Sequence, residues 1–147
     1  MIHLQDLLAA TGGRVHGAVH ADRFAGFAYD SRIAQPGDLF LAVKTARADG
    51  HDYIAHACQQ GAAGVLCERP PDLGGQPVTC VVVSDVREAL TDWARYILRK
   101  YAPEVVCITG SAGKTTTKEM VLAIASRSRQ VLATTGNFNN QIGLPLT

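Results

Sequence analysis

Apolar residues in this chain repeat with two periods, one typical of helices and one typical of strands. Repeats at every third and fourth position predict helices over residues 3–10, 54–60 and 85–101, and another that opens at Lys114 and continues over residues 119–125. Short β-branched and apolar runs predict strands over residues 24–29, 38–43, 64–68, 79–83, 105–108 and 130–134. Helices that alternate with strands predict an α/β fold.

The longest predicted helix, over residues 85–101, lies near the boundary between two predicted domains. Asp85 and Glu88 form a start that resembles a capping box, and Pro103 prevents the helix from continuing. We expect the apolar stripe of this helix to pack on a second sheet. The two predicted domains are residues 1–84 and residues 85–147.

A glycine turn follows the strand predicted over residues 105–108. Glycine accepts positive φ and has no Cβ, so backbone N–H groups in such a turn can surround a phosphate at the positive end of the next helix. Lys114 would then reach the β- and γ-phosphates of ATP, and the Thr115 hydroxyl would bind Mg²⁺. The predicted ATP-binding residues are Gly110, Ser111, Ala112, Gly113, Lys114, Thr115 and Thr116, of which Lys114 and Thr115 are the predicted catalytic residues.

This turn departs from the strict phosphate-loop spacing. That spacing would place a glycine where the chain has Ile108, so only the shorter pattern Gly110-x-x-Gly113-Lys114-Thr115 is present. The alternative is a strand-to-helix turn with an exposed lysine and no ligand. The strand expected before the turn and the helix expected after it favour the nucleotide site.

Two polar clusters lie at the ends of predicted strands, where α/β sheets bind ligands. Ser31 and Arg32 offer a rotatable hydroxyl and a planar fork of donors to an anion, and the alternative is a turn with a solvated arginine. A second cluster of uncharged hydrogen-bonding side chains follows residues 130–134, and its alternative is an ordinary asparagine-rich turn. The candidate ligand-binding residues are Ser31, Arg32, Asn137, Asn139 and Asn140.

Composition limits the classes of function. The chain has 147 residues, of which 47% are apolar, and its formal net charge is +1. Acidic and basic residues are interspersed, which argues against binding to a nucleic-acid backbone. No stretch approaches the ~20 apolar residues of a membrane span, so we expect a cytoplasmic protein. We expect the cysteines to be buried, reduced thiols; they are Cys58, Cys67, Cys80 and Cys107. We expect His51 to lie on the surface or in the core instead of binding a metal.

The two glycine-containing stretches resemble the Mur ligases, ATP-dependent enzymes that form amide bonds during synthesis of bacterial cell-wall precursors. The resemblance rests on residues 109–120, which read TGSAGKTTTKEM, and on residues 136–147, which read GNFNNQIGLPLT. The uridine-nucleotide-binding domain of that family is similar to residues 30–32 (DSR), 36–40 (PGDLF), 49–52 (DGHD) and 61–62 (GA). Lys44-Thr45 departs from the family, which usually has a glycine there.

The resemblance implies a small N-terminal α/β domain that binds a uridine nucleotide, followed by the start of a P-loop-type ATPase domain with a parallel sheet. Within the family, residues 136–147 are most similar to the member that uses ATP and Mg²⁺ to join D-alanyl-D-alanine to UDP-N-acetylmuramoyl-tripeptide through an acyl phosphate. Ser31 and Arg32 would then face the uridine nucleotide. The gap between nucleotide and acceptor would be lined by Asn137, Asn139 and Asn140.

The same resemblance implies three domains, of which this chain would be the N-terminal third. We therefore expect this portion to be inactive by itself. We also expect a monomer. Two other functions stay open: another Mur ligase, especially one that adds the third amino acid, and a non-catalytic module that binds the uridine nucleotide without turnover. A P-loop kinase is disfavoured by the β-rich region ahead of the glycine turn.

Overall fold

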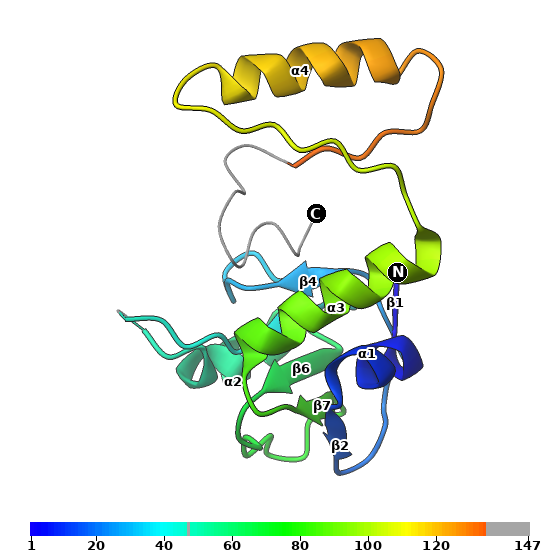
Figure 1. Ribbon diagram of the computed structural model, residues 1–147. Helices are drawn as coiled ribbons and strands as arrows, with labels where there is room; N and C mark the ends of the chain where they lie inside the picture. The colour runs from blue at the N-terminus through cyan, green and yellow to red at the C-terminus, as the bar shows by residue number, and fades with distance from the viewer. Residues whose placement is uncertain (47, 135–147) are drawn as a thin grey trace.

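A five-stranded sheet with the order β2-β7-β6-β5-β4 organises the N-terminal part of the chain (Figure 1). The computed structural model describes residues 1–46 and 48–134. The strands of this sheet are β2 (Arg14–His16), β4 (Phe27–Ala28), β5 (Leu39–Leu41), β6 (Gly64–Cys67) and β7 (Thr79–Val82). Strands β4 to β7 are parallel, and β2 pairs with β7 in the antiparallel direction at one edge. The mixed α/β fold expected from the sequence is confirmed.

Helices cover both faces of this sheet. The helices beside the sheet are α1 (Leu4–Thr11), the 3-10 helix η1 (Gly50–Tyr53), α2 (Ile54–Gln59) and α3 (Val86–Tyr101). A further helix, α4 (Lys114–Ala125), contributes to neither core cluster. A separate antiparallel pair is formed by β1 (Ile2–His3) and β3 (Arg23–Phe24). The apolar residues of α1 and α3 share one core cluster, and those of α2 belong to another. Three layers result, with the sheet in the middle (Figure 1).

Strand β5 shows how the alternation of side chains fills both clusters. Leu39 and Leu41 are fully buried in the cluster that contains α1 and α3, whereas Phe40 belongs to the cluster that contains α2. Successive side chains of a strand point to opposite faces, so a strand buried on both sides is continuously apolar. This explains why the parallel strands read as apolar runs.

Helix α3 packs on the N-terminal sheet. Val86, Leu90 and Trp93 are buried in the same cluster as α1 and the sheet. The expectation that this stripe packs on a second sheet is therefore wrong: the sheet beside it, together with α1, already offers an apolar face, and no strand follows α3 within the described residues. The division into residues 1–84 and 85–147 stays a prediction, although this packing favours a boundary after α3.

Neither strand expected around α4 forms in the described part of the chain. Residues 105–108 and 130–134 are not assigned to any strand. A strand is stabilised by hydrogen bonds to its neighbours, and apolar runs without such neighbours have no ladder to join. As a result Cys107 is exposed, against expectation, while Cys67 and Cys80 are buried as expected and Cys58 is half-buried.

Candidate functional site

The glycine turn leads into α4, and its backbone has the conformation that glycine supplies. Gly113 is the N-cap residue of α4 with φ 75°, and no side chain caps this end of the helix. A φ of this sign disfavours residues with a Cβ, which explains why a glycine stands here. Residues 109–117 are exposed. The first-turn N–H groups, which have no partner within a helix, thus lie at an open, positive helix end.

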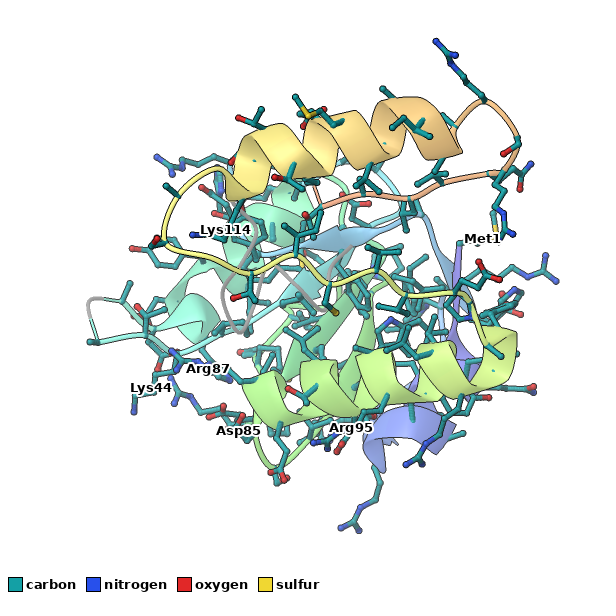
Figure 2. The ribbon with its side chains drawn as sticks, turned by 45° about the horizontal axis from the view of Figure 1, so that its top comes forward. Met1, Lys44, Asp85, Arg87, Arg95 and Lys114 are labelled. Atoms are coloured by element: carbon teal, nitrogen blue, oxygen red, sulfur yellow. The ribbon has the colours of Figure 1, made fainter. Side chains whose placement is uncertain are left out.

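Lys114 folds back over this turn. Its Nζ donates to the carbonyl oxygen of Gly110 at 2.5 Å. Figure 2 shows Lys114 at the beginning of α4. Lys118, one turn later, instead donates to the Thr134 carbonyl at 2.7 Å and lies 3.2 Å from the Glu119 carboxylate. Of these two lysines, only Lys114 holds its ammonium beside the turn, where an arriving phosphate could replace the carbonyl.

The turn fits a nucleoside triphosphate with its Mg²⁺. The helix start has no side-chain cap, and the exposed Thr115 follows Lys114 directly. Mg²⁺ usually takes few protein ligands and completes its shell with phosphate oxygens and water, so one threonine hydroxyl is a sufficient protein contribution. The individual roles stay predictions for Gly110, Ser111, Ala112, Gly113, Lys114, Thr115 and Thr116.

A second candidate region follows β4, where Asp30 and Arg32 form a two-pronged ion pair. Arg32 Nη2 lies 2.6 Å from Asp30 Oδ2, and Arg32 Nε lies 2.9 Å from Asp30 Oδ1. Hydrogen bonds from the Arg32 side chain, the larger cause, and from the Arg32 backbone N–H lower the pKa of the Asp30 carboxyl to about 2. The Arg32 side chain remains 82% exposed, whereas Ser31 is buried. The solvated-arginine turn is thus present, and contact of Ser31 and Arg32 with a nucleotide stays a prediction.

A group of charged and polar residues gathers at the carboxyl edge of the parallel strands. Asp49 Oδ1 lies 2.6 Å from His51 Nδ1, and Asp49 Oδ2 accepts from Arg69 Nη2 at 3.0 Å. The pKa of the Asp49 carboxyl is well below its ordinary value because the backbone N–H and the ring of His51 donate to it, with Arg69 adding a further hydrogen bond. Ligands of open α/β sheets bind at this edge.

Sequence patterns did not single out this group as a site. The side chain of His51 is buried. The residues that complete the group come from the end of a different strand: Glu68 donates its backbone N–H to His51, and Arg69 donates to Asp49. The available signal was the short stretch Asp49-Gly50-His51 directly after a buried strand. The predicted substrate residues Asn137, Asn139 and Asn140 lie outside the described residues.

Two family models match the chain. Residues 23–103 match the model described as Mur ligase family, catalytic domain, and residues 108–147 match the Mur ligase middle domain. The first match covers more than half of the chain and includes α3. No helix in the described ranges is long and apolar enough to cross a membrane.

Individual proteins give the same result. The chain is 39% identical over 146 residues to a UDP-N-acetylmuramoyl-tripeptide–D-alanyl-D-alanine ligase from Treponema pallidum, covering 93% of this chain and 32% of that protein. A crystal structure of MurF from Acinetobacter baumannii superposes with a TM-score of 0.88 at 38% identity, covering 98% of this chain and 31% of that one. The MurF ligase from Thermotoga maritima in complex with ADP gives a TM-score of 0.69 at 36% identity, over 89% and 29% of the two chains. This chain thus spans about a third of the length of these relatives.

Proposed function

The chain belongs to the Mur ligase family, and from this premise we propose that it is the nucleotide-binding part of a UDP-N-acetylmuramoyl-tripeptide–D-alanyl-D-alanine ligase. Relatives with that name match it along most of its length. The substrates would be ATP, UDP-N-acetylmuramoyl-tripeptide and D-alanyl-D-alanine. The expected monomeric state and cytoplasmic location stay predictions.

The observation that carries this proposal is the start of α4, where Gly113 leaves the helix end uncapped and Lys114 lies over the turn. In the reaction, the terminal carboxylate of the tripeptide would attack the γ-phosphate of ATP, which breaks the bond to the β-phosphate and gives an acyl phosphate and ADP. Two anions must approach one another in this step, so their charges have to be neutralised and their atoms aligned. The turn amides and Lys114 would hold the phosphates in line, and Mg²⁺ bound at Thr115 would neutralise further charge.

The second half of the reaction would be attack of the D-alanyl-D-alanine amine on the acyl phosphate, with release of inorganic phosphate. In our proposal, Ser31 and Arg32 face the uridine nucleotide at the carboxyl edge of the sheet. The gap between the nucleotide and the acceptor would be lined by Asn137, Asn139 and Asn140. We propose that the acceptor and adenine contacts come from outside this chain, whose relatives are about three times as long, since it covers 32% of one of them.

The Lys114→Ala variant tests the role of the glycine turn. In the ligase that contains this chain in full length, we expect ATP turnover to fall by a factor of about 10² or more, because removal of one preorganised charge donor costs on that order. Arg127→Ala is the matched control, since it removes a cation from just beyond the C-terminal end of α4, far along the helix from the glycine turn. Activity of Lys114→Ala within a few-fold of the control would contradict the proposed role.

The Thr115→Val variant separates the metal from the phosphates. It keeps the shape of the side chain and removes the hydroxyl, so we expect the Mg²⁺ concentration needed for half-maximal turnover to rise while ATP binding without metal is unchanged. Equal Mg²⁺ dependence in the variant and the unmodified ligase would show that the metal is held elsewhere.

A further inference from the structure

The side chain of His51 joins two loops at the carboxyl edge of the sheet, and it is only 5% exposed. Its Nδ1 lies 2.6 Å from Asp49 Oδ1, and its Nε2 accepts a hydrogen bond from the backbone N–H of Glu68 at 3.0 Å. A nitrogen that accepts cannot carry a proton, so the ring is neutral and its proton lies on Nδ1, which donates to Asp49. One ring therefore ties the chain after β5 to the end of β6.

Two further hydrogen bonds extend this tie to the start of α3. Glu68 Oε1 accepts from the backbone N–H of Val86 at 3.3 Å, and Arg87 Nη2 donates to the carbonyl oxygen of Lys44 at 2.6 Å. Figure 2 shows Lys44, Asp85 and Arg87 together at this end of α3. The exits of β5, β6 and β7 are thus held together at the edge where α/β sheets bind ligands.

The stretch that carries His51 can pack closely against the end of β5 because Gly50 has no side chain. A Cβ on Gly50 would lie 2.6 Å from the backbone nitrogen of Val43, closer than such atoms approach one another. The loop also closes on itself, since Lys44 and Asp49 form an antiparallel bridge and the Gly50 N–H donates to the Val43 carbonyl at 3.0 Å. The position of Lys44 therefore depends on what holds Asp49 and Gly50.

Two exposed cationic residues, Arg69 and Lys44, are held by the hydrogen bonds around His51. The Arg69 side chain is 61% exposed, yet its Nη2 is held 3.0 Å from Asp49 Oδ2. Lys44 is exposed, and its backbone is held by Arg87. Arg69 and Lys44 thus offer positive charge to solvent from loops that His51 fixes, an arrangement suited to a diphosphate.

We propose that His51 is a positioning residue for the uridine nucleotide: as a neutral acceptor it fixes the loop of Lys44 and, through Asp49, holds Arg69 toward the diphosphate. This inference rests on the proposed function, because it takes the uridine nucleotide to bind at this edge. His51 would touch no substrate and would act only through the groups that it holds.

The tie would depend on pH because protonation of Nε2 replaces an acceptor by a donor that faces the Glu68 N–H. Asp49 on the same loop and the backbone of Glu68 after β6 bond to the ring directly. Arg69 reaches it only through Asp49, and Arg87 from α3 contacts the Lys44 carbonyl. Asp49 remains ionised, since its hydrogen bonds hold its pKa well below the ordinary value. Protonated His51 could keep the bond to Asp49 but would lose the bond to Glu68.

Two substitutions separate the halves of this tie. The amide of Gln reaches the position of Nε2, so His51→Gln can still accept from the Glu68 N–H. The amide of Asn reaches only the position of Nδ1, so His51→Asn keeps a donor for Asp49 and loses the acceptor for Glu68. Neither amide changes charge with pH.

The experiment measures binding of UDP-N-acetylmuramic acid to the full chain by calorimetry between about pH 5.5 and 8.5, the range in which a histidine changes charge. The diphosphate of this probe is esterified at both ends and keeps its charge over this range. We expect the affinity of the unmodified chain to fall as the pH is lowered. We expect the affinity of His51→Gln to be the same at all pH values. We expect His51→Asn to bind about tenfold more weakly than the unmodified chain does at high pH, and to do so at every pH.

Hydrogen exchange of the Glu68 amide gives a second readout that needs no ligand. We expect exchange to be fast in His51→Asn and slow in His51→Gln. Binding of the probe by His51→Asn as tightly as by the unmodified chain at high pH, or equal Glu68 exchange in the two variants, would overturn the positioning role alone. Absence of binding by the unmodified chain at every pH would instead overturn the proposed function at this edge, and the positioning role with it.

Discussion

At the scale of single residues, the ion pair of Asp30 and Arg32 predicts how the stability of the fold changes as the pH is lowered. The folded pKa of Asp30, about 2, lies below the ordinary value for aspartate of about 3.9. The ion pair therefore stabilises the fold fully above the ordinary value, and this contribution is lost as the pH falls toward 2. Because the Arg32 side chain is 82% exposed, solvent and salt reduce the size of the effect.

In the Arg32→Ala variant, we expect the pKa of Asp30 to rise toward the ordinary value, because the hydrogen bond from the Arg32 side chain is the largest cause of its lowering. Titration of the Asp30 carboxyl carbon by NMR measures this directly. Arg99→Ala serves as the control because it removes an arginine from the last turn of α3. An Asp30 pKa that stays unchanged in Arg32→Ala would contradict the ion pair.

At the scale of elements, the start of α3 is fixed by one carboxylate. Asp85 Oδ1 accepts from the backbone N–H groups of Arg87 at 2.7 Å and Glu88 at 2.8 Å. The cap expected from the sequence is thus present. We expect Asp85→Ala to lower the free energy of unfolding by about 1 kcal/mol, and Asp85→Ser to retain most of it. Urea denaturation of the two variants measures the difference, and equal losses in both would show that the cap contributes nothing.

The success of sequence patterns depended on the length of each element and on its partners. Helices α1 and α3 were predicted because each carries an apolar stripe with a helical period, and strands β5, β6 and β7 because each lies in a short apolar run. Strands β1 and β2 were missed because they have 2 and 3 residues and, unlike the equally short β5, do not lie in a longer apolar run. The single strand expected over residues 24–29 is split between β3 and β4, which belong to different sheets.

The candidate site was predictable only where its residues are adjacent in the chain. The glycine turn and the helix that follows it were identified because Gly110, Gly113 and Lys114 lie in one short stretch. The tie at His51 joins residues from separate strand ends, and nothing in the spacing of Asp49, His51 and Glu68 reveals that they meet. The strands at residues 105–108 and 130–134 could not be judged from their own composition, since a strand also needs neighbours.

At the scale of the whole molecule, the part of the chain up to the end of α3 and the part after it differ in how much apolar surface they bury. The residues before Tyr101 form two apolar clusters, whereas large apolar side chains of residues 102–134 are open to solvent. Figure 1 shows α4 and its flanking segments apart from the sheet. Among the described residues after α3, the exposed large apolar ones are Val105, Val106, Met120, Ile124, Val131 and Leu132. The stability of the chain should therefore come from its first part, including α3.

Two shortened chains test this conclusion and the position of the domain boundary. A chain that ends at Ala102 keeps both apolar clusters, so we expect its free energy of unfolding in urea to stay within about 1 kcal/mol of the full chain, near the uncertainty of the extrapolation. A chain that ends at Ser84 lacks Val86, Leu90 and Trp93, which are buried against α1 and the sheet.

Each of these large side chains contributes about 1.5–3 kcal/mol by burial. Their joint loss is comparable to the ~5–15 kcal/mol that stabilises an ordinary domain, so the chain ending at Ser84 should be largely unfolded. Circular dichroism and a urea transition distinguish the two chains. If the shorter chain folded as stably as the longer one, α3 would belong with the second domain, as the sequence-based division into residues 1–84 and 85–147 predicts. If both chains unfolded, residues after Tyr101 would contribute to the stability of the first part despite their exposed apolar surface.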